Sequence, residues 1–282
     1  MGILNLTPDS FSDGGLFLAP GKAVERGLAL LAEGADLLDL GAESTRPGGG
    51  VYGAGARTVP VEEELGRLLP VLTALRRQTD APLSVDTRKG EVARQALAAG
   101  ADLVNDVSAV ANPDPDLGRA VAQAGCPLVL MHSRGDLSTM QQEIHFADLL
   151  AEVRAELCQA VERAVALGVD PAQLVLDPGI GFGKTARQNL LLLRRLDAFA
   201  DLDRPLLVGA SRKSFLGTLG SGPPAPPERR LGGSLAAVGW AARQGAAMVR
   251  VHDVAETVQF LAAWEAIAAA TPAISTASEE AG

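Results

Sequence analysis

Polar side chains that could do chemistry stand at the ends of eight short apolar runs. The runs end at Asn5, Asp39, Asp86, Asn105 with Asp106, Met131 with His132, Asp177, the segment 211–214 (Ser-Arg-Lys-Ser), and Arg250 with His252. A single polar residue at such a place is commonly a cap, but eight in one chain do not fit that explanation. The carboxylates and amides suit a ligand rich in N–H donors. Lys213, Arg250 and His252 suit phosphate or carboxylate.

Alternating strands and helices must position these residues. The apolar runs cover 2–6, 36–40, 83–86, 103–106, 128–131, 174–177, 206–210 and 248–251, as expected of strands buried on both faces. Helical periodicity follows over 23–33, 62–77, 89–99, 116–124, 146–167, 186–200, 229–243 and 255–270. We therefore predict a single-domain α/β fold, a (β/α)8 TIM barrel over 1–270, with a disordered tail at 271–282. A doubly wound open sheet is the alternative.

Four connections are longer than the others, at about 7–20, 44–60, 132–145 and 211–227. They are rich in Gly, Pro and polar residues, and loops of this length in a compact domain are often functional lids. In a barrel all four would project from the C-terminal face, where active sites lie.

Composition excludes several classes of protein. The chain of 282 residues has a net charge of −9 and no Lys/Arg run longer than a pair, which argues against a nucleic-acid partner. No stretch of 18 apolar residues could cross a membrane, and no signal peptide is visible. Cys126 and Cys158 are the only cysteines, and they are interpreted as reduced thiols of a cytoplasmic protein.

The stretch "DPGIGFGKT" at 177–185 looks like a nucleotide-binding P-loop. That motif reads G-x-x-x-x-G-K-[ST], so its first glycine stands five residues before the glycine that precedes the lysine. In this chain the second glycine would be Gly183 and the lysine Lys184. Pro178 occupies this place, and Gly179 comes one residue too late. The segment is therefore interpreted as another kind of turn, with Lys184 either at the solvent-facing start of a helix or functional.

A resemblance covers nearly the whole chain. "MGILNLTPDSFSDGG" at 1–15, "DLGAESTRPG" at 39–48 and "SVDT" at 84–87 resemble dihydropteroate synthases, a family of pterin-binding enzymes. So do "NDV" at 105–107, "LDPGIGFGK" at 176–184, "ASRKSFLG" at 210–217 and "VRVHDV" at 249–254. The resemblance implies a (β/α)8 barrel that joins 6-hydroxymethyl-7,8-dihydropterin pyrophosphate to p-aminobenzoate, giving 7,8-dihydropteroate and pyrophosphate for folate biosynthesis. It also implies a magnesium-dependent, homodimeric transferase and sulfonamide target.

The resemblance implies a role for each residue that matches its motifs. Asp177 would read the donor edge of the pterin, while Asp86 and Asn105 would contact other ring nitrogens and Arg250 would stack on the ring. Lys213 would donate to the pterin carbonyl. Met131 and Phe182 would form apolar walls, and Gly209 would let the backbone approach the ring. The catalytic residues implied are Asp86, Asp177, Lys213, Arg250 and His252.

The second half of the site would hold the diphosphate and the aminobenzoate. Asn5, Arg250 and His252 would contact the diphosphate, and Asn5 would help to hold Mg²⁺. The residues expected around p-aminobenzoate and in the covering loops are Phe11, Thr45, Arg46, Pro47, Phe182, Lys213 and Ser214. Pyrophosphate would leave first, and the aniline nitrogen would then attack the resulting cation.

Other interpretations remain open. A pterin-dependent methyltransferase acting on methyltetrahydrofolate would share the contacts of Asp86, Asn105 and Asp177. An aldolase would use Lys213 as a Schiff-base lysine, and a non-catalytic pterin scaffold would use the same pocket. Asp39 and Asp106 could be anchors or caps, Glu43 could order its loop, and His145 could lie on the surface.

One departure from the family concerns the first strand. Family members usually carry a β-hairpin before the motif that opens at Met1 in this chain, at the barrel end opposite the site. We expect an upstream extension to raise the melting temperature, and an unchanged value would contradict this.

Overall fold

The computed structural model describes residues 1–6, 20–43, 59–109, 115–134 and 144–270. The predicted site residues Phe11, Thr45, Arg46 and Pro47 and the predicted tail at 271–282 lie outside these ranges. None of the helices in the described ranges combines the length and apolar character that a membrane crossing requires.

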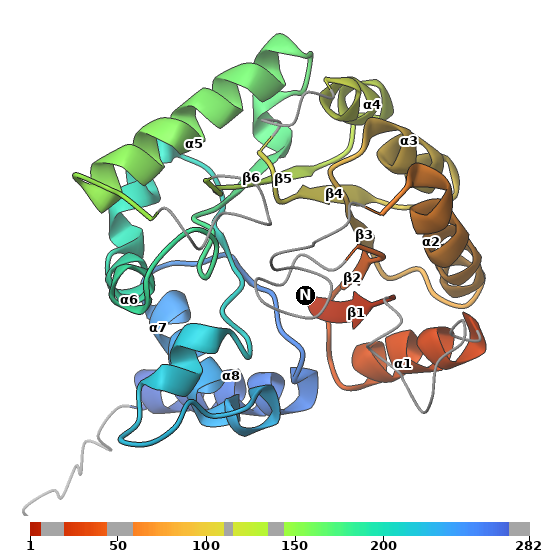
Figure 1. Cartoon of the computed structure of the whole chain (residues 1–282). Coiled ribbons are helices and arrows are strands. Elements are labelled where there is room, and N and C mark those ends of the chain that lie inside the picture. The colour runs from red at the N-terminus through yellow and green to blue at the C-terminus, as the bar shows by residue number, and fades with distance from the viewer. Residues whose placement is uncertain (7–19, 44–58, 110–114, 135–143, 271–282) are drawn as a thin grey trace, which may run out of the picture.

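Parallel strands form the wall of a barrel (Figure 1). Six of them pair in chain order: β1 (Gly2–Asn5), β2 (Leu38–Gly41), β3 (Leu83–Asp86), β4 (Leu103–Asp106), β5 (Leu128–Met131) and β6 (Leu174–Asp177). The short strands β7 (Leu207–Val208) and β8 (Met248–Val249) pair with each other. Isolated parallel bridges Leu176↔Leu206 and Gly2↔Val251 join this pair to β6 and β1. The predicted barrel is confirmed, and the sequential strand order excludes the doubly wound alternative.

Helices surround the strands (Figure 1). They are α1 (Pro20–Ala32), α2 (Val61–Arg76), α3 (Gly90–Ala98), α4 (Asp116–Ala124), α5 (Leu149–Ala166), α6 (Ala186–Arg194), α7 (Leu231–Arg243) and α8 (Val254–Ala269). The helix predicted over 186–200 is too long, because α6 ends at Arg194 and the chain continues as the 3-10 helix η3 (Leu196–Leu202). Further 3-10 turns are η2 (Pro171–Gln173), η4 (Ser214–Thr218) and η5 (Pro227–Arg229). Outward-facing strand residues pack against the helices in two large aliphatic clusters.

The strand interior is divided into layers. A buried apolar floor joins Met1, Leu37, Leu103, Val129 and Leu207, with Val175 and Met248 packed against it. Side chains alternate along a strand, so the residue two positions later faces the same interior. In the same strand order those residues are Ile3, Asp39, Asn105, Met131 and Gly209, then Asp177 and Arg250. Five of the predicted site residues therefore lie in the layer directly above this apolar floor, namely Asn105, Met131, Asp177, Gly209 and Arg250.

Candidate active site

Arg250 is held between two carboxylates from different strands. Its Nε donates to Oδ2 of Asp39 at 2.5 Å, and a terminal nitrogen donates to Oδ2 of Asp86 at 3.0 Å. The same oxygen of Asp39 accepts from the Asn105 side chain at 3.1 Å. Asp39 is fully buried, and Asp86 and Asn105 are nearly so. The guanidinium of Arg250 is thus fixed in a buried polar cluster that joins β2, β3, β4 and the end of β8.

Burial strongly affects the titration of this cluster. It raises the pKa of Asp86 to about 7, against the opposing effect of Arg250. Burial also raises the pKa of Asp177, although Lys213, Lys184 and Arg250 favour its charged form. Burial lowers the pKa of Lys213 to about 7 despite the nearby carboxylate of Asp177. Each charge is therefore costly in the protein alone, and opposite charges of a ligand would lower that cost.

Lys213 lies against the loop that follows β6. Its Nζ donates to the backbone oxygen of Ile180 and lies 4.1 Å from the ring centroid of Phe182. Phe182 packs with Met131 and Val107 in a small buried apolar cluster. The predicted walls Met131 and Phe182 therefore do come together, and Val107 is a third member that sequence reasoning missed.

Gly209 separates Arg250 from Asp177. A Cβ atom at this position would lie 4.0 Å from both Cδ of Arg250 and Oδ2 of Asp177. A larger side chain would fill the space between the cation and the carboxylate. The glycine therefore keeps this part of the interior open, and the close approach of its backbone to a pterin ring stays a prediction.

The turn at 178–184 is not a phosphate cradle. The backbone N–H of Gly179 donates to Oδ1 of Asp177 at 2.7 Å, so the first amide of the turn faces a carboxylate. Gly179 has φ +70°, and a Cβ there would lie 1.8 Å from the backbone oxygen of His132. Thr185 and Gln188 form a capping box that begins α6. The glycines serve close packing beside Asp177, which agrees with the rejection of a P-loop.

Lys184 is not a solvent-facing residue. Only 3% of it is exposed, and its ammonium contacts Nδ1 of His132 as well as the backbone oxygens of Gly179 and Phe182. The solvent-facing alternative is therefore wrong, because the turn folds around the lysine side chain. Its pKa falls to about 7, chiefly through burial.

The diphosphate side of the predicted site contains His252 and Asn5. Ser211 Oγ lies 3.1 Å from Nδ1 of His252, and the backbone N–H of His252 donates to the same hydroxyl at 3.2 Å. Asn5 is partly exposed at the end of β1 and is in register with Gly41, which is in turn in register with Asp86. Ser214 is exposed at the start of η4. Arg212 forms an ion pair with Asp253.

Glu43 and Val59, the described residues on either side of 44–58, contact each other. Buried Glu43 accepts from the backbone N–H of Val59 at 3.3 Å and from Lys89 at 2.9 Å. Lys89 also pairs with Glu64 of α2. These contacts support the structural interpretation of Glu43. Asp106 likewise accepts from the backbone and hydroxyl of Ser108, as a turn residue does.

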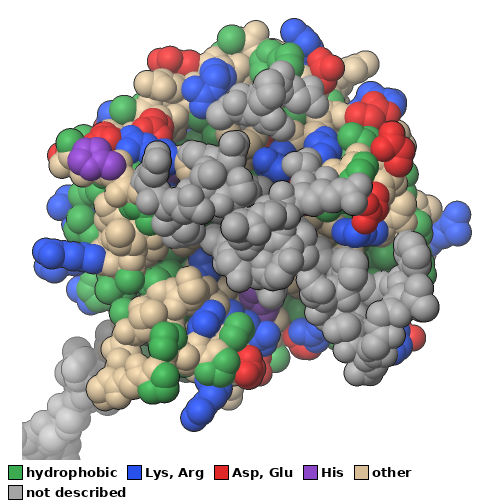
Figure 2. All heavy atoms as spheres, in the orientation of Figure 1, with side chains coloured by type: hydrophobic (Ala, Val, Ile, Leu, Met, Phe, Trp, Pro, Cys, Tyr) green, Lys and Arg blue, Asp and Glu red, His purple; other side chains and the backbone are tan. Residues whose placement is uncertain are grey.

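Side chains on the face with the strand ends are mixed in charge (Figure 2). Around the grey atoms, Lys and Arg are interspersed with Asp and Glu, and the described side chains visible on this face form no basic stripe. His145 is exposed, as the surface interpretation expected.

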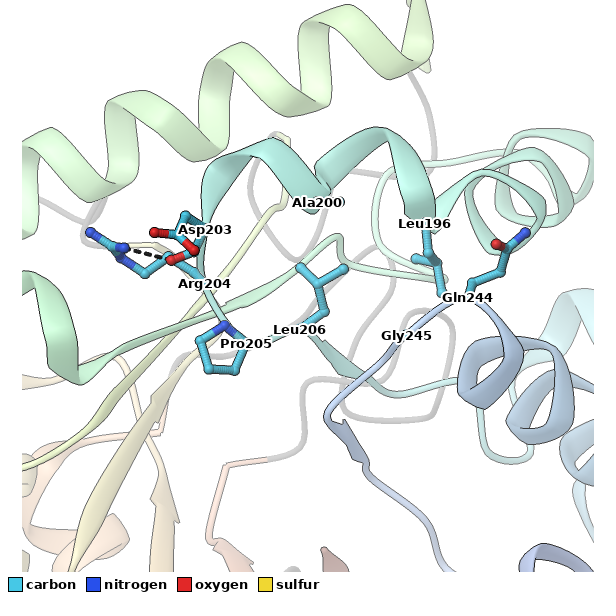
Figure 3. A pocket seen from close by; sticks show the side chains of 8 residues that line it. All are labelled: Leu196, Ala200, Asp203, Arg204, Pro205, Leu206, Gln244 and Gly245. Carbon is cyan, nitrogen blue, oxygen red and sulfur yellow. Dashed lines mark hydrogen bonds between the residues drawn. The ribbon is translucent and has the colours of Figure 1, made fainter. Parts of the chain in front are cut away.

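A separate hollow of about 350 Å³ lies at the N-terminal end of the strands, opposite the cluster around Arg250 (Figure 3). It is lined by η3 residues and by segments that precede β7 and β8, among them Arg204, Leu206 and Gln244. It therefore does not belong to the cluster around Arg250.

The sequence model of one family, described as pterin binding enzyme, matches residues 1–252. The chain belongs to this family. The dihydropteroate synthase of Synechocystis is 47% identical over 259 residues, which cover 92% of this chain and 86% of that protein.

Solved structures agree with this assignment. Xanthomonas albilineans dihydropteroate synthase with 4-aminobenzoic acid aligns with a TM-score of 0.86 and 48% identity, covering 96% of this chain and 93% of that one. The Yersinia pestis dihydropteroate synthase in a sulfonamide drug complex aligns with a TM-score of 0.86 and 42% identity, with the same two coverages.

Asp39 is the central residue that sequence reasoning left as a possible anchor. We expect Asp39→Asn to lower the free energy of unfolding by about 3 kcal/mol, because Arg250 loses one buried charged partner. Urea denaturation measures this value. Asp116→Asn, which alters an exposed ion pair at the start of α4, is the control and should have little effect. Equal losses in both variants would contradict a central role for Asp39.

Proposed function

We propose that this chain catalyses the dihydropteroate synthase reaction. It condenses 6-hydroxymethyl-7,8-dihydropterin pyrophosphate with p-aminobenzoate, and it releases pyrophosphate and 7,8-dihydropteroate. The observation that carries the proposal is the buried set of carboxylates and cations around Arg250, built on an apolar floor. Such a set suits a flat ligand with donors on one edge and anionic groups at one end.

The pterin is assigned to the buried part of this set. A 2-amino group beside a ring N–H forms a paired donor edge, and a carboxylate accepts two parallel hydrogen bonds from it. Asp177 takes this part, because one of its oxygens already accepts from Gly179 and the group lies beside the open space at Gly209. Asp86 and Asn105 accept from and donate to other ring positions, and Lys213 donates to the carbonyl. Arg250 covers the ring face, with Met131 and Phe182 as the apolar wall.

The diphosphate is assigned to Asn5, His252 and Arg250. These residues come from β1 and from the end of β8, which the bridge Gly2↔Val251 places side by side. Arg250 and His252 directly follow β8 and flank Val251, the residue that forms this bridge. Ser211 Oγ lies within hydrogen-bond distance of Nδ1 of His252, which supports the placement of this imidazole at the diphosphate end.

Magnesium is proposed as the cofactor on the chemistry of the donors. Among the described residues, no group of three His, Cys, Asp or Glu side chains is placed to hold a metal ion. Mg²⁺ commonly binds through one or two protein oxygens together with substrate phosphates. The amide oxygen of Asn5, at the diphosphate end, fits that pattern. When bound there, the ion would neutralise charge on the leaving pyrophosphate.

The reaction proceeds by departure of pyrophosphate and then attack by the aniline nitrogen. Arg250 and His252 stabilise the charge that collects on the departing oxygens. Asp86 and Asp177 stabilise the positive charge that spreads from the methylene carbon into the pterin ring. The apolar floor and the wall at Phe182 keep water away from this cation.

The aminobenzoate is assigned to the rim of the site. Lys213 and Phe182 face it from the buried side, and Ser214 is a partner for its carboxylate. Phe11 and the Thr45–Arg46–Pro47 segment are proposed to cover it. The Xanthomonas albilineans relative was solved with 4-aminobenzoic acid, which supports a site for this substrate.

The two other catalytic interpretations make different demands. A methyltransferase would not need Phe11, the Thr45–Arg46–Pro47 segment or the Ser211–Ser214 segment. An aldolase needs a desolvated lysine, and the lowered pKa of Lys213 meets that condition. However, the side chain donates to Ile180 and lies near Asp177, which suits a bound ammonium. Borohydride trapping with carbonyl substrates distinguishes the two uses of Lys213.

The synthase proposal is tested by measuring pyrophosphate release. We expect release only when both substrates and Mg²⁺ are present, and a sulfonamide should inhibit it in competition with p-aminobenzoate. Arg250→Met is expected to reduce kcat by at least about a hundredfold, because it removes a cation that stabilises the leaving group. Folded wild-type protein without aminobenzoate-dependent release would refute the proposal.

The pH dependence of kcat/KM tests the buried charges. Asp86, with its pKa raised to about 7, becomes protonated as the pH falls below 7. Lys213, with its pKa lowered to about 7, loses its proton as the pH rises above 7. We therefore expect a bell-shaped profile with its maximum near neutral pH. Lys213→Arg should remove the alkaline limb and keep the acidic limb. An unchanged alkaline limb would assign it to another group.

A homodimer in the cytoplasm is also proposed. Apolar side chains of α7 and α8 are exposed, namely Trp240, Val258, Trp264 and, most of all, Ile267 at 76%. An exposed apolar surface of this kind supports an interface with a second copy. Two free cysteines fit a reducing compartment. Recovery of the activity in a membrane pellet would contradict the cytoplasmic location.

The dimer proposal predicts that a charge introduced at Ile267 weakens the association of the two copies. Ile267→Glu is expected to shift the protein from dimer to monomer in analytical ultracentrifugation, because the carboxylate would be buried unpaired at the interface. Val165→Glu, at a residue of α5 that is 40% exposed, should leave the dimer intact. A wild-type monomer at micromolar concentration would overturn the assignment.

A further inference from the structure

The ammonium of Lys184 is satisfied by three neutral acceptors inside the protein. Nζ lies 2.9 Å from Nδ1 of His132, 3.0 Å from the oxygen of Gly179 and 2.9 Å from the oxygen of Phe182. An ammonium has three N–H donors, so each donor meets one acceptor. A buried lysine without a direct carboxylate partner is costly, and burial lowers its pKa. Two of the three acceptors are backbone oxygens of the turn at 178–184, so the ammonium holds this turn in place.

A chain of contacts orients the acceptor on His132. Nε2 of this histidine lies 2.9 Å from Oε2 of Glu156 on α5, and Glu156 also accepts from Nε of Arg134 at 2.9 Å. Burial is the main cause that lowers the pKa of His132 to about 4, so the ring is neutral near pH 7. With its proton on Nε2 and donated to Glu156, Nδ1 is left as an acceptor for Lys184.

The opposite side of the same turn contacts Lys213. Ile180 supplies a backbone oxygen to Nζ of Lys213, and the ring of Phe182 lies beneath the same nitrogen. At Gly181, which has φ +85°, a Cβ would lie 2.4 Å from Cδ of Lys213. Phe182 is thus held at its carbonyl by Lys184 and presents its ring to Lys213. The turn lies between two lysines, one internal and one in the site.

We infer that Lys184 is a positioning residue for the aminobenzoate side of the site, acting through Phe182 on Lys213. Its ammonium fixes the carbonyls of the turn, and the turn places the aromatic ring and the oxygen of Ile180 against Lys213. This inference rests on the proposed function for the role of Phe182 and Lys213. It adds His132 and Glu156 as the groups that orient Lys184.

A double-mutant cycle tests this path. We compare kcat/KM for p-aminobenzoate, at saturating dihydropterin pyrophosphate, in wild type, Lys184→Met, Phe182→Ala and the double variant. Lys184→Met is expected to lower kcat/KM by about tenfold to a hundredfold, as misplaced binding groups commonly do. If Lys184 acts through Phe182, the double variant loses no more than the worse single variant. Losses that multiply, or full activity in Lys184→Met, overturn the inference.

Two controls separate positioning from stability. Lys22→Met applies the same change to an exposed lysine of α1, and it should keep wild-type kcat/KM. Circular dichroism verifies that each variant is folded. If Lys184→Met does not fold, Lys184→Gln takes its place in the same cycle, with the same outcomes.

A second readout does not depend on turnover. The chain has four lysines, so ¹³C-lysine labelling gives a simple NMR spectrum. The Phe182 ring should shift the Hε resonances of Lys213, and Phe182→Ala should abolish that shift. We expect Lys184→Met to abolish it too and Lys22→Met to preserve it. A preserved ring shift in Lys184→Met refutes the inference, whereas an inactive wild type refutes only the proposed reaction.

Discussion

The ion pairs of Arg250 with Asp39 and Asp86 are the interaction on which the rest of the site depends. They lie on an apolar floor, where a single unpaired charge would be very costly. The guanidinium of Arg250 pairs with two of these charges, because its planar donors reach carboxylates on two strands at once. The same contacts link the start of the barrel to its last strand, so electrostatics and closure of the fold support each other.

The site combines buried charged side chains, whose charged forms are disfavoured, with open space at Gly209. Burial disfavours the charged forms of Asp86, Asp177 and Lys213, yet all three must be charged to recognise the proposed pterin and its carbonyl. A ligand that brings donors to the carboxylates and an acceptor to the lysine reduces this cost. Under the proposed function, substrate binding and the pKa values of these residues are coupled, and Gly209 leaves open the space between Arg250 and Asp177.

Much of this arrangement could be predicted from local pattern. The strands at 83–86, 103–106, 128–131 and 174–177 were predicted with the observed boundaries, because continuous apolar runs bounded by polar residues leave little ambiguity. The last two strands are shorter than predicted, since only isolated bridges extend them. Helix α6 ends before its predicted end. Leu196 and Phe199 are buried from the 3-10 helix η3 as they would be from an α-helix, so the spacing of apolar residues does not distinguish the two.

The sequence by itself determined which residues face the interior, because side chains alternate with a period of two along each strand. Asp39, Asn105, Asp177 and Arg250 each stand two positions after a floor residue, which is a purely local fact. Only the tertiary structure decided their partners. Arg250 and Asp39 are 211 positions apart and meet because the barrel closes, and Lys184 is buried because its turn folds around it. Hydrogen bonds and burial depend on distances in space, which no pattern of neighbouring residues specifies.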